Sequence, residues 1–115
     1  MTEICTNQVC LIKQTEQNAP IELESNKGLS NVRGSLAMAR TNIPNSATSE
    51  FYINLVDNLS LDYKNAANPG YAVFGKVITG KAVLDALANM PTTTQYGLSD
   101  FPSQSLVIQS VTQTQ

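Results

Sequence analysis

Two stretches of the chain alternate between large apolar residues and small or polar ones, and each alternation predicts a β-strand. The segment SLAMAR, residues 35–40, places leucine and methionine on one face and alanines on the other. The segment FYINLV, residues 51–56, places Phe, Ile and Leu on one face and Tyr52 and Asn54 on the opposite one. The pattern predicts that the apolar face packs into the core, while Tyr52 and Asn54 face a groove.

Two more strands are predicted nearer the C-terminus. The turn signal NPG, with Pro69 and then Gly70, precedes the apolar segment YAVFGKVI at residues 71–78. Gly75 within that segment predicts a bulge or a bend. The apolar segment SLVIQSV, residues 105–111, predicts the last strand.

Between these strands the apolar period changes to that of a helix. The spacing predicts a helix over residues 81–89, with Thr79 as its N-terminal cap and Pro91 ending it. Several strands, one short helix and long loops favour an all-β barrel or sandwich with a helical cap. The length of 115 residues fits one domain.

Composition excludes several classes of function. Apolar residues make up 42% of the chain and charged residues 14%, with a net charge of −2. The seven Lys and Arg residues are scattered singly, so no basic stripe favours nucleic acid. There is no bilayer-spanning apolar run and no secretory signal, so the sequence predicts a soluble protein and leaves cytoplasm or periplasm open.

The chain contains no histidine, which excludes a Ser-His-Asp triad, a Cys-His pair and histidine metal sites. Cys5 and Cys10 would face opposite sides of a single strand, and their spacing is poor for a zinc knuckle. They are interpreted as thiols without a chemical role.

Three blocks in order resemble the cyclophilin-type peptidyl-prolyl isomerases of bacteria. They are RGSLAMA, NSATSEFYINL and VFGKVITGKAVLDAL, and the resemblance runs from about Pro20 to the C-terminus. It implies a closed antiparallel β-barrel capped by two helices, with a shallow groove on the outer face. It also implies cis–trans interconversion of X-Pro bonds in proline-containing proteins or peptides, with no cofactor or metal. The oligomeric state is left open.

This reaction needs no nucleophile or proton relay, because no covalent bond breaks. The obstacle is rotation about a partial double bond, with a barrier of roughly 18–20 kcal/mol. A catalyst must bind the twisted transition state more tightly than either planar ground state. An apolar pocket for the proline ring and a cationic donor to the prolyl nitrogen would achieve this.

The resemblance places seven residues in the substrate groove. Ala39 and Arg40 stand where the family offers backbone contacts to the residue before proline. Tyr52 stands at the floor of the proline pocket, with Leu61 on its wall and Tyr71 at a position that is His or Tyr in the family. The remaining two positions are Glu50 and Ser60.

Three of these positions depart from the family pattern. Glu50 replaces a Gln and so exchanges an amide for an acceptor-only carboxylate. Tyr52 replaces a Phe and adds a hydroxyl, which needs a partner or costs stability. Ser60 replaces an aromatic wall residue. Together they predict weakened binding. Glu50 and Tyr52 are interpreted as groove-lining polarity and not as an acid–base pair, because no third group completes a relay.

The largest departure is the absence of the family's FHR and QGGD segments, which carry the catalytic arginine and part of the pocket. Residues 1–18 match neither segment, so residues 19–115 are predicted to form the C-terminal part of an incomplete barrel. Arg33 is interpreted as structural and Arg40 as non-catalytic, which leaves no catalytic residue. An incomplete barrel predicts marginal stability or self-association.

Three functional hypotheses follow from the sequence. The first is a prolyl isomerase whose catalytic competence is weakened by the missing arginine. The second is a module that binds proline-containing segments without turning them over. The third is an inactive fragment.

Overall fold

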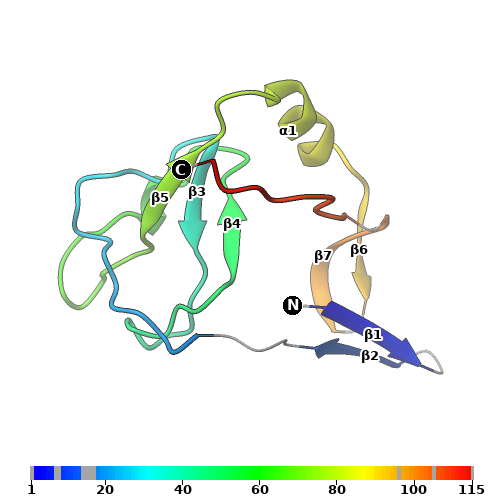
Figure 1. Ribbon diagram of the computed structural model, residues 1–115, viewed down its shortest axis with the longest axis horizontal. Coiled ribbons are helices and arrows are strands. Elements are labelled where there is room, and N and C mark those ends of the chain that lie inside the picture. The colour runs from blue at the N-terminus through cyan, green and yellow to red at the C-terminus, as the bar shows by residue number, and fades with distance from the viewer. Residues whose placement is uncertain (1, 7–8, 14–17, 96, 105, 115) are drawn as a thin grey trace.

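The computed structural model describes residues 2–6, 9–13, 18–95, 97–104 and 106–114, and Figure 1 shows their arrangement. The chain is mostly β-structure with one α-helix. The helices of these residues are too short and too polar to traverse a lipid bilayer.

A three-stranded antiparallel sheet, in the order β4-β3-β5, organises the largest part of the fold. Its central strand β3 spans Ser35–Met38, flanked by β4 at Phe51–Ile53 and β5 at Val73–Lys76. The register places Ala37 opposite Tyr52 on one side and Val73 on the other. The two strands predicted from alternation are therefore confirmed and are direct neighbours.

Two separate hairpins flank this sheet. One joins β1 (Thr2–Thr6) to β2 (Val9–Lys13), and the other joins β6 (Thr92–Gln95) to β7 (Leu98–Pro102). The three sheets share no strand pairing, so the described residues form a β-rich fold whose sheets do not close into a barrel.

The first hairpin corrects the interpretation of the two cysteines. Cys5 lies in β1 and Cys10 lies in β2, and the register sets their backbones directly opposite each other. They do not share one strand, because the chain reverses between them.

The helix α1, Lys81–Ala88, lies where its apolar period predicted it. Its N-cap is Gly80 and not Thr79, and no side chain caps its first turn. Leu84 is buried, whereas Val83 is 61% exposed. An ion pair between Arg33 and Asp85 joins the helix to the turn before β3, so the structural role predicted for Arg33 agrees with its contacts.

Two glycine predictions agree with the structure. The β3–β5 register passes from the pair Leu36–Gly75 to the pair Ala37–Val73, which leaves one residue of β5 bulged beside Gly75. Gly70 has a φ of +65° and follows the short 3-10 helix η1, Leu59–Leu61, by one loop. A Cβ at Gly70 would lie 2.4 Å from the carbonyl oxygen of Leu61, so this position requires glycine.

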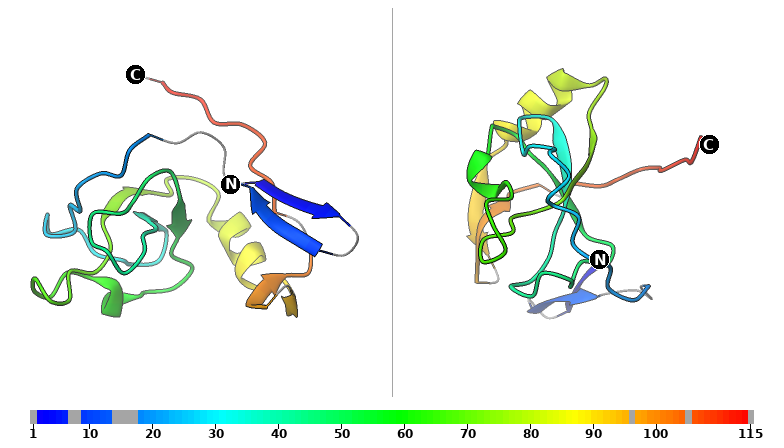
Figure 2. Two further views of the ribbon diagram at one scale, coloured as in Figure 1. Left: turned by 90° about the horizontal axis from the view of Figure 1, so that it is seen from below. Right: turned by 90° about the vertical axis from the view of Figure 1, so that its left-hand side faces the viewer.

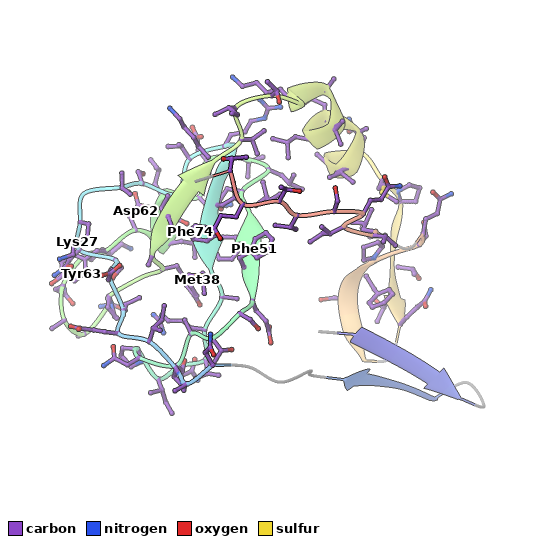
Figure 3. All side chains as sticks on the ribbon, in the orientation of Figure 1. Lys27, Met38, Phe51, Asp62, Tyr63 and Phe74 are labelled. Carbon is purple, nitrogen blue, oxygen red and sulfur yellow. The ribbon has the colours of Figure 1, made fainter. Side chains whose placement is uncertain are left out.

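The buried positions differ from those that alternation predicts. The buried residues described by the structure are small or polar, with Leu84 the exception, and comprise Ser25, Asn31, Ser35, Ala37, Ala47, Asn54 and Leu84. On the predicted core face, Phe51 is 43% exposed, whereas Ile53 and Leu55 are half-buried, and Phe74 on the neighbouring strand β5 is 54% exposed. Asn54, predicted to face a groove, is buried instead. Figure 3 shows the two phenylalanine rings and Met38 gathered on the sheet, and the two rings meet edge to face at 6.2 Å. The loop at residues 21–29 reaches only part of this face, where its residues share a cavity of about 390 Å³ with Met38 and Phe74.

The predicted last strand is wrong for the residues that the structure describes. Residues 106–114 have no strand pairing, and the side chains of Leu106, Val107, Ile108 and Val111 are all exposed. Figure 2 shows this segment running away from the sheets. The radius of gyration is 15.5 Å, above the roughly 13 Å of a compact domain of this length. The segment has no partner strand among the described residues.

We expect Gly70→Ala to destabilise the fold by more than the about 1–2 kcal/mol that a left-handed backbone alone costs. The added Cβ would also collide with the backbone of Leu61 and Asp62. Gly28→Ala is the matched control, because Gly28 has a φ of +84° and open space around its Cβ position. Urea unfolding monitored by circular dichroism gives both values, and equal losses would contradict the close approach.

We expect the open apolar face to drive self-association. The double variant Phe51→Thr/Phe74→Thr introduces threonine, which also favours strands. It removes two aromatic side chains, and the burial of each would contribute about 1.5–3 kcal/mol of free energy. Its self-association constant should fall by at least about tenfold. Sedimentation measures this, with Val56→Thr as a control in a loop. A parent chain that stays monomeric and melts cooperatively above about 50 °C would count against it.

Candidate functional site

A cavity of about 370 Å³ opens beside the central sheet, lined by five of the seven residues that the resemblance placed in the groove. Its size lies at the lower end of the range for small-ligand sites. These residues come from the end of β3, from β4, from η1 and from the loop before β5, and they are Ala39, Arg40, Tyr52, Leu61 and Tyr71. We refer to this cavity as the aromatic pocket.

Two tyrosine rings form the aromatic wall of the pocket. The rings of Tyr52 and Tyr71 meet edge to face, with 6.0 Å between their centroids and 81° between their planes. The backbone N–H of Tyr71 donates to the carbonyl oxygen of Leu61 at 2.9 Å, which closes the loop between the two residues. Three pocket walls that are distant in sequence are thereby brought together.

The guanidinium of Arg40 lies against this wall, with its Cζ 4.6 Å from the ring centroid of Tyr71. Its Nε and Nη2 both donate to the carbonyl oxygen of Gly70, at 2.9 and 2.7 Å, and its Nη1 donates to the carbonyl oxygen of Thr41 at 2.8 Å. These bonds and the cation–π contact fix the guanidinium as part of the wall.

The hydroxyl of Tyr52 has the partner that its position demands. It donates to Oδ1 of Asn31 at 2.9 Å. The pKa of Tyr52 is raised from 10.0 to about 12, mainly by burial and then by the negative charges of ionised Tyr71 and Asp62, while the charge of Arg40 acts in the opposite direction. The phenol is therefore neutral at physiological pH and serves as a hydrogen-bond donor.

The other two predicted groove residues lie outside this pocket. Glu50 is half-buried at the start of β4, and its backbone carbonyl accepts the N–H of Ala39 at 2.9 Å. Ser60 is exposed and lines a neighbouring, more polar cavity of about 320 Å³, whose lining includes Arg40 and Tyr71. The two cavities thus share one wall.

Sequence reasoning missed two residues behind the pocket. Asn31, with no exposed surface, and Asp62 join the backbone of the 61–71 loop to the turn before β3. Burial raises the pKa of Asp62, but donation from the Ser30 hydroxyl and from the backbone and side-chain N–H groups of Asn31 outweighs it and lowers that pKa. The signal available in the sequence was the hydroxyl of Tyr52, which requires a buried acceptor nearby.

The chemistry of the pocket suits the binding of a ring between apolar and aromatic walls. Among the residues that the structure describes, no group of three or more His, Cys, Asp or Glu is arranged to hold a metal ion. Ala39 and Arg40, which follow β3, also line the cavity.

Comparison with known proteins shows the family. The profile described as cyclophilin type peptidyl-prolyl cis-trans isomerase/CLD matches residues 5–113. A peptidyl-prolyl cis-trans isomerase of Acinetobacter baylyi is 50% identical over 101 residues, which are 87% of this chain and 53% of that protein. Peptidyl-prolyl cis-trans isomerase B of Escherichia coli K12 is 42% identical over 103 residues, which are 88% of this chain and 63% of that protein.

The chain therefore belongs to the cyclophilin-type peptidyl-prolyl isomerase family, and the resemblance drawn from its sequence blocks is confirmed. It spans between about half and three-fifths of the length of these relatives. The predicted boundary between residues 18 and 19 stays a prediction, as do the roles of the groove residues.

We expect Tyr52→Phe to change how stability depends on pH. The folded chain holds the Tyr52 proton up to about pH 12, whereas the unfolded chain releases it near pH 10, so the parent loses stability between these values. The variant lacks this loss and, near pH 7, should be less stable by about 0.5–1.5 kcal/mol because one hydrogen bond is gone. Urea unfolding at pH 7, 9 and 11 should show the difference shrinking as pH rises; a constant difference would contradict the raised pKa.

Proposed function

We propose that the aromatic pocket binds the proline ring of X-Pro segments in protein chains, and that the chain acts on them as a peptidyl-prolyl cis-trans isomerase of reduced competence. The observation that carries the proposal is the convergence of Ala39, Arg40, Tyr52, Leu61 and Tyr71 on one cavity of about 370 Å³. Membership of the family supports it, because the relatives are named for this activity.

In this proposal the proline ring enters between the rings of Tyr52 and Tyr71 and the side chain of Leu61. The backbone at Ala39 and Arg40 holds the residue before the proline in an extended conformation. As the X-Pro amide twists, the lone pair of the prolyl nitrogen leaves conjugation with the carbonyl. The pocket stabilises this twisted state only if a hydrogen-bond donor reaches that nitrogen.

The supply of that donor limits the rate. The chain has two arginines, Arg33 and Arg40. Arg33 pairs with Asp85 of the helix and lines no part of the pocket, and Arg40 donates to the carbonyls of Gly70 and Thr41. Neither replaces the arginine of the FHR segment in our proposal, since a catalytic donor must be held within about half an ångström.

The contacts of the two arginines also favour a second candidate function, a module that binds proline-containing segments without accelerating their rotation. In this reading the pocket walls supply affinity, and neither Arg33 nor Arg40 supplies the donor that acceleration needs. The two candidates share a ligand and differ only in turnover.

The decisive experiment compares the chain with the same chain carrying an N-terminal extension that supplies the FHR and QGGD segments. We expect both to bind the peptide Ala-Ala-Pro-Phe, and the unextended chain to isomerise it about 10²- to 10³-fold more slowly. Exchange spectroscopy by NMR measures the rate, and chemical-shift changes at the five pocket residues report binding. The peptide Ala-Ala-Ala-Phe is the control for proline.

Each outcome has a distinct meaning. Equal rates would overturn our account of the missing arginine. Binding with no acceleration by the unextended chain favours the binding module. Shift changes that are equal for the two peptides, or absent for both, would reject the proposed function of the pocket.

A further inference from the structure

One buried side chain, that of Asn31, contacts three of the pocket walls from behind. Its Oδ1 accepts the hydroxyl of Tyr52 at 2.9 Å. Its Nδ2 donates to the carbonyl oxygen of Leu61 at 3.2 Å and lies 3.4 Å from that of Tyr71. These partners stand 21, 30 and 40 positions away in the sequence.

Asn31 is itself held firmly in place. Its backbone N–H and its Nδ2 both donate to Oδ1 of Asp62, at 2.6 and 3.0 Å. Its Oδ1 also accepts Nδ2 of Asn54 at 3.1 Å, and that same Nδ2 donates to Oγ of Ser35 at 2.8 Å. With no exposed surface, Asn31 has little freedom to change its rotamer.

The chemistry of these contacts requires a primary amide. The hydroxyl of Tyr52 needs an acceptor, and the carbonyl oxygen of Tyr71 takes a donor. The carbonyl oxygen of Leu61 already accepts the backbone N–H of Tyr71, and Asn31 gives it a second hydrogen bond. Within a side chain of this length, only asparagine supplies both. A carboxylate would face the carboxylate of Asp62 and offer no donor, and an apolar residue would leave buried polar groups unsatisfied.

We propose that Asn31 is a positioning residue of the aromatic pocket, setting the separation of its Tyr52, Leu61 and Tyr71 walls. It lines no part of the cavity and so acts through those walls without touching a peptide. The inference rests on the proposed function for its ligand, but the placement of the walls can be measured without one.

Asn54 provides a matched control. It is also an asparagine with almost no exposed surface, and it belongs to the same hydrogen-bond network. Its side chain bonds to Asn31, Ser35 and Asn58 and to no pocket wall. Asn31→Ala and Asn54→Ala therefore remove the same atoms from equally buried positions, and they differ in whether the walls lose their support.

The test compares these two variants in two ways, under conditions where unfolding curves show both folded. In the free protein, nuclear Overhauser contacts between the rings of Tyr52 and Tyr71 report the placement of the walls. In peptide titrations, the dissociation constant for Ala-Ala-Pro-Phe reports the site. We expect Asn31→Ala to lose the ring contacts and to weaken peptide binding by about tenfold. Asn54→Ala should keep the ring contacts and change binding by less than about threefold.

A purely structural role would move both variants together. Equal effects of the two variants on ring contacts would overturn the inference, as would ring contacts that persist in Asn31→Ala. If the parent chain binds no peptide, the proposed function fails, and the ring contacts still decide the role of Asn31.

A measurement on the parent chain decides the case if either variant does not fold. The side-chain amide protons of Asn31 should exchange with solvent at least about tenfold more slowly than those of the exposed Asn26, because they are buried and bonded. Exchange as fast as that of Asn26 would overturn the inference.

Discussion

The pairing of β3 with a strand on each side is the constraint on which the rest of this structure depends. It sets Ala37, which has no exposed surface, opposite Tyr52 and Val73. Because Ala37 is fully enclosed, a larger side chain there would displace one of these neighbours. A shift of Tyr52 would separate its hydroxyl from Asn31 and its ring from Tyr71. The small side chain of Ala37 thus determines where the pocket floor lies.

The two faces of the central sheet differ in how completely their side chains are satisfied or buried. On the face behind the pocket, every buried side-chain polar atom that the structure describes has a hydrogen-bond partner. On the opposite face, the rings of Phe51 and Phe74 meet each other and remain largely exposed. A polar network can be satisfied locally by a few residues, whereas an apolar face needs a second layer to exclude water. The site is therefore better formed than the core that would normally support it.

The sequence predicted those features that depend on local spacing or on a family pattern. Alternation located β3 and β4, the helical period located α1, and Pro69 with Gly70 located the turn before β5. The resemblance grouped Tyr52, Leu61 and Tyr71, which the structure brings to one cavity. It could not reveal Asn31, because bonds that span 21 to 40 positions leave no periodic signal.

Burial was the property that alternation predicted least well. The pattern of residues 51–55 identifies two faces, but burial depends on which segments cover each face, and the described loops cover the apolar one only in part. The segment at residues 106–111 failed as a strand for a related reason. Its apolar residues give it the capacity to pair, and pairing also needs a free strand edge within reach.

The backbone hydrogen bond from Tyr71 to Leu61 closes the loop between them at its base. It holds these two pocket walls together regardless of the conformation of the intervening residues. Lengthening such a loop costs free energy only slowly, because closure entropy grows with the logarithm of its length. The tip of the loop, at residues 64–68, is exposed and borders the polar cavity that shares a wall with the aromatic pocket. Changes in the length and charge of this tip would therefore alter the polar cavity while the bond between Tyr71 and Leu61 keeps the aromatic pocket in place.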